Sequence, residues 1–294
     1  MSLTIHPTEA VGAFVSGADM GDLTRGEASE LYRAFLEYGV LIFKGLKLGV
    51  TEHIKLSKLF GEMDAPHPLE ELRHKDVPSL TVLAANNGVP VPADDPEADR
   101  IIGTIPWHAD RIYTSRPIRG ALLRAVVIPE KGGNTGWIDT ARVYRSLPYK
   151  IKCKIQGVSI VHSYETAHRS QSMVKGGAGI LPETIHPLIV VHPETNLPAL
   201  NISPATAKTL VGPPEEEGRE LLDYLIAFAI NEDYAYIHEW EAGDLVAWDN
   251  FRAIHRAYGH AKRYPRVMHS LALSPEMTLG REIANGAPDQ LAAA

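Results

Sequence analysis

The N-terminal part of the chain contains one amphipathic helical pattern followed by one continuous apolar run. Thr24 and Glu27 form a capping-box pattern, and apolar residues follow at helical spacing as far as Gly39. The run VLIF at 40–43 is apolar throughout, which predicts a buried strand. A second helix is predicted from Thr51 to Phe60, where Gly61 would end it.

From residue 79 onward, short β-type runs bounded by turn residues dominate the pattern. The runs are LTVLA, GALLRAVVI, GVSIVHSY, LIVVH, DLVAW and RVMHSLALS. One late helix is predicted over about Glu216–Ile230, and Asn87–Asp99 and Lys175–Pro187 are predicted to be long loops. Together these patterns predict an α+β, mostly β protein, with an antiparallel core and a few helices packed outside it.

Composition narrows the class of protein further. The chain has 294 residues, of which 45% are hydrophobic, so it can bury a sizeable core. No apolar stretch is long enough for a membrane helix, and the N-terminus lacks a secretory signal, so we expect a cytoplasmic protein. Cys153 is the single cysteine, which excludes an intramolecular disulfide and a cysteine-based zinc cluster. The net charge of −7 and the absence of a long basic run argue against nucleic-acid binding.

The segment Trp107-His108-Ala109-Asp110 is the most informative short stretch. If it lies in a strand, His108 and Asp110 point to the same face and can reach one metal ion. A third ligand, His255, follows the predicted strand LVAW after a Gly-Asp turn. Two histidines and one carboxylate form the facial triad of non-haem Fe(II) oxygenases, which leaves positions open for a 2-oxo acid and dioxygen.

Spacing and composition leave other interpretations open. A His-x-Asp pair also occurs by chance on protein surfaces, and the chain has 13 histidines, so other third ligands are conceivable. These rivals are His162, His168, His238 and His260. A metal-dependent hydrolase could use the same His/Asp/His triad. A non-catalytic β-sandwich binding protein is a further alternative.

Six segments resemble the TauD/TfdA family of Fe(II)/2-oxoglutarate-dependent dioxygenases, which includes taurine dioxygenase and 2,4-D dioxygenase. The segments are AVGAFVSGADMGDLTRGEASELYRAFLEYGVLIFKGL, LSKLFGEMDAPHP, WHAD, PEKGGNTGWIDTARVYRSLP, AWDNFRAIHRA and RYPRVMHS. Their spacing matches the family pattern as well as their letters do, and the resemblance covers nearly the whole chain.

This resemblance implies a single domain over 1–294, with a double-stranded β-helix (jelly-roll) core and flanking helices. It implies Fe(II), with 2-oxoglutarate and O2 as co-substrates. It further implies oxidation of an unactivated C–H of a small organic molecule, with release of succinate and CO2. Hydroxylation is the expected outcome, while desaturation and ring formation stay open. Relatives are often dimers or tetramers, so a homo-oligomer is an open expectation.

Carried over residue by residue, the resemblance makes His108, Asp110 and His255 the iron ligands. It makes Thr135 and Arg266 the partners of the distal carboxylate of 2-oxoglutarate. A planar guanidinium suits a carboxylate, and a hydroxyl adds one more donor. A hydrolase has no need of Thr135 and Arg266 at these positions, so the pair favours the oxygenase.

One position departs from the family pattern. In the sulfonate-binding members, an arginine four residues after the 2-oxoglutarate arginine holds the substrate's anionic head, and here that residue is Ser270. Serine cannot make a bidentate charged contact, so taurine is predicted to be a poor substrate. Ser270 should share a strand face with Arg266.

Further residues are candidates for contact with the substrate. His67 matches a family histidine near the substrate. Arg111, Arg119 or Lys262 could restore the missing cation; otherwise the substrate is less acidic, or larger and more apolar.

Overall fold

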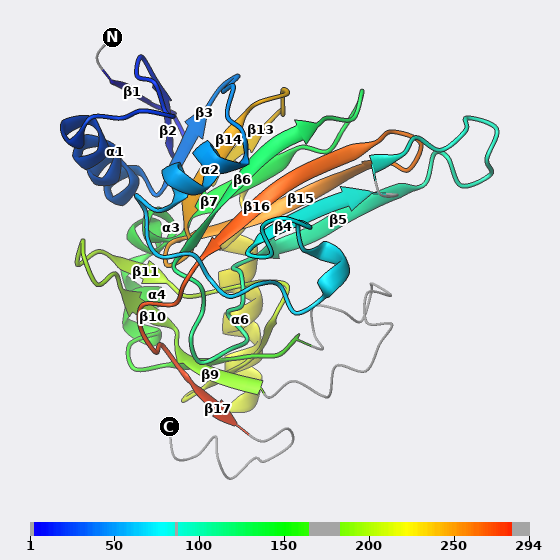
Figure 1. Ribbon diagram of the computed structural model, residues 1–294. Coiled ribbons are helices and arrows are strands. Elements are labelled where there is room, and N and C mark those ends of the chain that lie inside the picture. Colours follow the sequence, from blue (N-terminus) through cyan, green and yellow to red (C-terminus); the bar gives the residue numbers. More distant parts are fainter. Residues whose placement is uncertain (1–2, 86–87, 165–182, 284–294) are drawn as a thin grey trace.

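Two antiparallel sheets face each other in the computed structural model, which describes residues 3–85, 88–164 and 183–283 (Figure 1). The larger sheet has seven strands, in the order β1 (Thr4–Pro7), β2 (Ala13–Ser16), β3 (Val40–Phe43), β14 (Leu245–Asp249), β6 (Gly120–Val127), β16 (Arg266–Leu273) and β4 (Leu80–Ala85). The smaller sheet has four, in the order β13 (Ala235–His238), β7 (Thr135–Asp139), β15 (Ala253–Ala261) and β5 (Ile101–His108). Among these pairings, β2 and β3 run parallel.

The remaining elements lie around these two sheets. A further sheet contains β12 (Ala207–Val211), β8 (Ser159–His162), β9 (Glu183–Pro187) and β17 (Arg281–Ile283), and a hairpin pairs β10 (Ile189–Val191) with β11 (Pro198–Leu200). The α-helices are α1 (Arg25–Tyr38), α2 (Val50–Ser57), α3 (Thr140–Ser146), α4 (Tyr149–Lys154) and α6 (Glu215–Ala229). Short 3₁₀ turns cover Glu70–Leu72 and Glu232–Tyr234. In the part of the chain described here, no helix is long and apolar enough to cross a bilayer.

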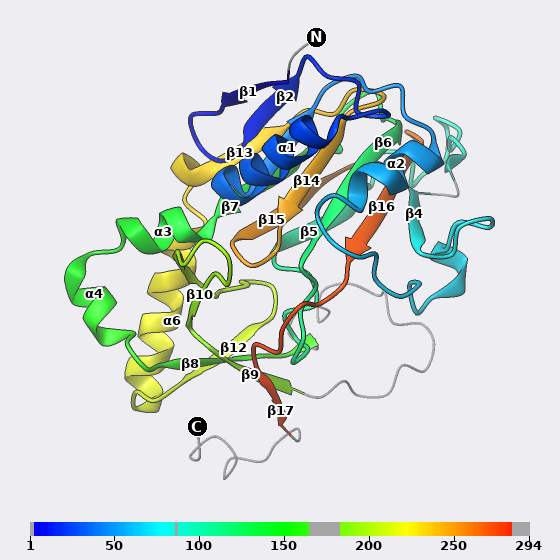
Figure 2. The same cartoon turned by 60° about the vertical axis from the view of Figure 1, so that its left-hand side comes forward.

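Three apolar layers hold the sheets and helices together. Between the sheets, Trp248 and Met268 of the larger sheet pack with Trp137 of the smaller one. On the outer face of the larger sheet, α1 and α2 cover side chains such as Leu41, while α6 packs against β12 and α3 (Figure 2). Burial of apolar area on this scale is the main stabilising term of such a fold. The expected mostly β architecture with helices outside it is confirmed.

Local sequence signals explain the helix boundaries, with one exception. Thr24 Oγ1 accepts the Glu27 N–H, Glu27 caps the Thr24 N–H in return, and Gly39 ends α1 at a φ of 70°. The helix predicted to reach Phe60 ends at Ser57 instead. Beyond it, the N–H groups of Leu59 and Phe60 bond three residues back, so the chain tightens into turns before Gly61.

One predicted loop contains a strand. Within Lys175–Pro187, residues 175–182 lie outside the described part of the chain, but Glu183–Pro187 forms β9, paired with β8 and β17. Thr184 and Ile185 are fully or nearly buried there, so tertiary packing outweighs the turn-like composition of the segment. Gly88–Asp99 contains no strand or α-helix, as predicted.

Candidate metal and co-substrate site

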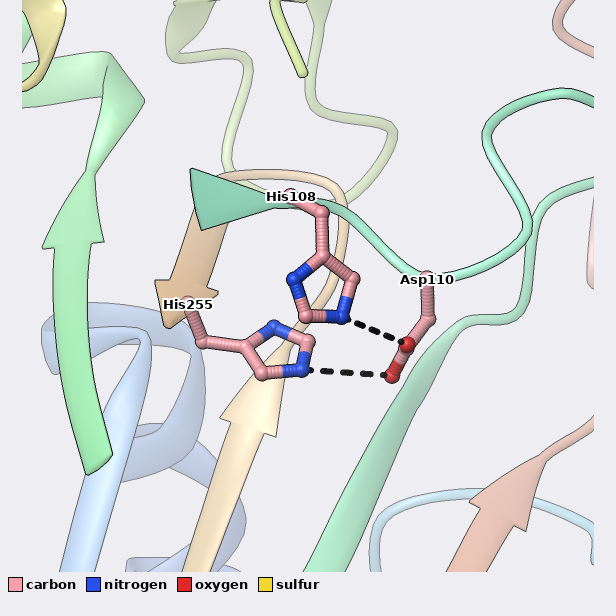
Figure 3. A group of neighbouring side chains, drawn as sticks. All are labelled: His108, Asp110 and His255. Carbon is pink, nitrogen blue, oxygen red and sulfur yellow. Dashed lines mark ion pairs between the residues drawn. The ribbon is translucent and has the colours of Figure 1, made fainter. Parts of the chain in front are cut away.

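Two side chains of the smaller sheet and one from the turn that follows it converge on one point. His108 is the last residue of β5, and His255 lies directly opposite it on β15. Asp110 follows two residues after the end of β5 and turns its carboxylate toward both rings (Figure 3). His108 Nε2 lies 3.5 Å from Asp110 Oδ1, and His255 Nε2 lies 3.8 Å from Asp110 Oδ2. The potential ligand atoms all lie within 4.8 Å of one another, so one ion could bind all three.

The expectation that His108 and Asp110 share a strand face is wrong in its detail. The strand ends at His108, so Asp110 reaches the site from the following turn, not through the two-residue repeat of a strand. Asn250 holds this turn in place. Its Oδ1 accepts the Asp110 N–H at 2.9 Å, and its Nδ2 donates to the Asp110 carbonyl, also at 2.9 Å.

The three groups shift one another's pKa: burial lowers the pKa of His108, but the hydrogen bond and charge of Asp110 outweigh burial and raise it. Burial by itself raises the pKa of Asp110, but the His255 and His108 rings bring that pKa down to about 2. Burial and the neighbouring His108 lower the pKa of His255 to about 3, so at neutral pH the ring is an uncharged ligand. The Nδ1 of His108 lies 2.8 Å from the Pro106 carbonyl, a contact that assigns the proton to Nδ1 and leaves Nε2 free to coordinate.

Thr135 and Arg266 come together from facing sheets. Thr135 opens β7, Arg266 opens β16, and Arg266 Nη2 reaches the carbonyl of Gly133, two residues before Thr135. Burial lowers the pKa of Arg266 to about 10, still far above neutral, and no ion pair to it is found within the described residues. A buried guanidinium without a carboxylate partner is costly. An anion bound here would relieve that cost.

The Gly132-Gly133 turn leaves the space that Arg266 uses. Both glycines have positive φ, 78° and 77°, a region that other residues rarely adopt. A Cβ on Gly133 would lie 2.8 Å from Pro129 Cγ and 3.3 Å from Arg266 Nε. The glycine pair therefore permits both the turn and the close approach of the arginine.

The comparison with known proteins decides the family. The model described as "Taurine catabolism dioxygenase TauD, TfdA family" matches residues 4–272. The chain belongs to the TauD/TfdA family. It is 32% identical over 290 residues to the (S)-phenoxypropionate/alpha-ketoglutarate-dioxygenase of Delftia acidovorans, covering 94% of this chain and 97% of the relative. It is 29% identical over 289 residues to the alpha-ketoglutarate-dependent 2,4-dichlorophenoxyacetate dioxygenase of a Burkholderia species, covering 94% and 93%.

The solved structures agree. A taurine dioxygenase from Burkholderia xenovorans superposes with a TM-score of 0.78 at 26% identity, covering 100% of this chain and 98% of that one. The protein is therefore a 2-oxoglutarate-dependent non-haem iron dioxygenase, with Fe(II), 2-oxoglutarate and O2 as the cofactor and co-substrates that its family implies. The family supports neither the hydrolase nor the non-catalytic binding protein.

Arg111, one of the residues predicted to lie on the substrate side, is paired. Arg111 adopts a φ of 52° directly after Asp110, and its Nη1 forms an ion pair with Asp64. His67 precedes the turn at Glu70, and its Nδ1 accepts the Leu69 N–H at 3.1 Å. Burial, together with the charges of Arg111 and Arg73, keeps the pKa of His67 below its usual value. The carboxylate of Asp64 thus already compensates Arg111.

Ser270 lies on β16 four residues beyond Arg266, between Leu123 of β6 and Thr81 of β4. The β4 pairing is regular from Arg266 to Leu271, so Ser270 shares a face with Arg266 and with Met268, which packs between the sheets. Arg119 is fully buried among Asp249, Glu194 and Glu276. Lys262 lies in the β15–β16 turn, where its N–H donates to the Arg100 carbonyl at 2.9 Å.

The rival histidines lie in other surroundings. His162 contacts Thr206 and His186, His238 contacts Asp244, and His260 contacts its neighbouring carbonyl. His168 lies outside the described residues. Within the described ranges, the triad is the one group of three or more such residues arranged to hold a metal ion.

Proposed function

We propose that His108, Asp110 and His255 hold the catalytic Fe(II), and that Thr135 and Arg266 bind the distal carboxylate of 2-oxoglutarate. The convergence of two imidazoles and one carboxylate within 4.8 Å carries this proposal. The same proposal treats residues 1–294 as one domain whose two facing sheets form a double-stranded β-helix. In that arrangement Arg266 belongs to the larger sheet, His108 and His255 belong to the smaller sheet, and Asp110 follows β5.

In this proposal each site residue has its own role in the reaction. Bound iron, with 2-oxoglutarate and O2, supplies the oxidising power to hydroxylate an unactivated C–H, with release of succinate and CO2. Asp110 lowers the net charge at the metal, while the His108 contact with Pro106 fixes the orientation of its ring. Arg266 supplies a desolvated positive charge for the carboxylate of the co-substrate.

The surroundings of Ser270 favour a substrate other than taurine. A sulfonate placed against this neutral side chain would lose its hydration without gaining a charged partner. Of the three cations considered as substitutes, Arg111 is paired with Asp64 and Arg119 is enclosed by three carboxylates, so neither of these two fills the gap. We therefore propose a larger, more apolar small molecule than taurine, with its polar group near His67.

A substrate panel tests this proposal. Substrate-coupled succinate release would be compared for taurine, (S)-phenoxypropionate, 2,4-dichlorophenoxyacetate and bulkier N-acyl or aromatic acids, with substrate-free turnover as the baseline. The phenoxy acids belong in the panel because relatives are named for them. We expect a bulky acid to give the highest kcat/KM and taurine the lowest. Saturable turnover of taurine at micromolar concentration would refute the argument from Ser270.

A further inference from the structure

A buried tryptophan donates a hydrogen bond to the threonine of the proposed 2-oxoglutarate site. Trp240 follows β13, and its indole Nε1–H donates to Thr135 Oγ1 at 3.0 Å. Both residues are nearly closed to solvent, with 7% of Trp240 and 3% of Thr135 exposed. A buried hydrogen bond of this kind directs its donor and its acceptor without competition from water.

The indole ring is fixed by its neighbours. His238 meets it edge to face, with 4.6 Å between the ring centroids. His238 is itself held at both nitrogens, by Asp244 at 3.0 Å and by the Tyr236 hydroxyl at 2.9 Å. The direction of the Trp240 N–H is therefore set by the contact with His238, whose own ring is held by Asp244 and Tyr236.

This contact has a consequence for the Thr135 hydroxyl. A hydroxyl has one proton to donate and two lone pairs, whereas an indole N–H can only donate. Trp240 therefore occupies a lone pair of Thr135 and leaves the hydroxyl proton to point elsewhere. Within the described residues that proton has no acceptor of its own. We infer that Trp240 is a positioning residue, which presents Thr135 as a hydrogen-bond donor to the distal carboxylate of 2-oxoglutarate. This inference rests on the proposed co-substrate site.

The first test measures 2-oxoglutarate binding to the full-length Fe(II) protein by calorimetry under anaerobic conditions. Trp240→Phe keeps the ring packing and removes the N–H, so we expect the Kd to rise about 3- to 10-fold. Trp137→Phe is the matched control. Its indole nitrogen is also buried, but it has no hydrogen-bond partner in the described part of the chain, so the Kd should stay within about twofold of the parent. An unchanged Kd in Trp240→Phe would overturn the inference.

Two further measurements separate positioning from simple packing. In a Thr135→Val background, Trp240→Phe should have no additional effect, because the bond it removes is already absent. The Kd of 2-oxobutyrate, which lacks the distal carboxylate, should be the same for Trp240→Phe and the parent. Equal weakening of both oxo acids, or full additivity with Thr135→Val, would mean that Trp240 acts through packing.

Arg266→Leu distinguishes failure of the inference from failure of the proposed function. If Arg266→Leu binds 2-oxoglutarate as tightly as the parent does, the proposed co-substrate site is wrong. If Arg266→Leu binds weakly and Trp240→Phe binds normally, the inference about Trp240 is wrong and the site stands.

Discussion

Two charged clusters lie at either end of the connection from β14 to β15, which runs from the larger sheet to the smaller one, and their charges serve different purposes. Asp249, at the end of β14, is completely buried and lies 2.6 Å from Arg119 and 2.8 Å from His192. His255, six residues later on β15, faces Asp110, whose side chain keeps 30% of its surface exposed. The Asp249 carboxylate is in close contact with protein partners, whereas the Asp110 carboxylate lies 3.5 Å from the His108 imidazole and 3.8 Å from that of His255.

The difference separates a structural network from a binding site. Glu194 and Glu276 add two more carboxylates around Arg119, so the first cluster is closed by protein groups. In the second cluster the nearest arginine, Arg111, is paired with Asp64, so the negative charge of Asp110 is left for a cation to compensate. Removing one partner of a buried ion pair destabilises the fold, whereas removing one side chain of an open cluster leaves the fold stable.

The largest expected effect is loss of activity in Asp110→Ala. Removing the carboxylate leaves two neutral ligands and raises the net charge at the metal, so iron-dependent succinate formation should disappear. The urea midpoint should change little, because Asp110 is partly exposed and makes no close ion pair. Normal turnover in this variant would show that the triad assignment is wrong. His108→Ala and His255→Ala should behave in the same way.

Asp249→Ala should show the opposite pattern. It leaves the buried Arg119 without its closest carboxylate, so the free energy of unfolding should fall by about 3–5 kcal/mol. Chemical denaturation measures this change. A variant with parental stability would mean that Glu194 and Glu276 suffice to hold Arg119, and the contrast between the two clusters would weaken.

Arg266→Leu should raise the 2-oxoglutarate concentration needed for half-maximal activity by about a hundredfold or more, because a desolvated charge partner is worth several kcal/mol. Iron binding should stay near the parental value, since Arg266 does not contact the triad in the structure. Titrations of each component, with the other saturating, check both statements. Equal 2-oxoglutarate dependence in variant and parent would move this role to another residue.

Asn250→Ala should weaken metal binding by about 10- to 100-fold, because it releases both backbone contacts that hold Asp110. Anaerobic Fe(II) titration measures the effect. Asn201→Ala is a suitable control, since the Asn201 amide also donates to a backbone carbonyl, that of Pro187, but in another region. If both variants bound iron like the parent, the turn around Asp110 would not depend on Asn250.

A pH-dependent effect concerns a buried group that is neither paired nor metal-facing. His53 is fully buried, its ring nitrogens have no hydrogen-bond partner among the described residues, and burial with the nearby charge of Arg124 lowers its pKa to about 3. The unfolded chain takes up this proton first, so stability is complete above about pH 6.5 and is lost as the pH falls toward 3. The loss is up to about 1.4 kcal/mol per pH unit.

Urea denaturation between pH 7.5 and 4.5 checks this statement. His53→Leu should flatten the acid slope without abolishing it, because His186 also has a lowered pKa, about 4. An identical slope in variant and parent would contradict the assignment.

The parts of the site that could be predicted from the sequence are those encoded in short motifs. His108 and Asp110 lie two residues apart, and the family pattern links them to His255, Thr135 and Arg266. The roles of Asn250 and Trp240 depend on hydrogen bonds across 140 and 105 residues of chain, and no local pattern reports such contacts. The position of Asp110 beyond its strand escaped prediction for the same reason.

In the fold, too, the predictable parts are those with a clear local pattern, and the rest depend on long-range contacts. Long periodic segments such as α1 and α6, and apolar runs such as β3 and β14, were predictable because local pattern and tertiary burial agree there. The strand β9 was not, because its turn-rich surroundings suggest a loop and only its pairing with β8 and β17 makes it a strand. The end of α2 was misplaced because a short run of three-residue hydrogen bonds replaces its last helical turn.

The edge position of β5 has a consequence for the order of events during synthesis of the protein. Within its sheet, β5 pairs with β15 alone, so the strand that carries His108 has no neighbour until residues near Ala261 have been made. At about 5–20 residues per second, a ribosome needs on the order of ten seconds or more to reach them. During that interval the nascent chain carries His108 and Asp110 without His255. We therefore expect iron to bind at this site only after His255 has been synthesised.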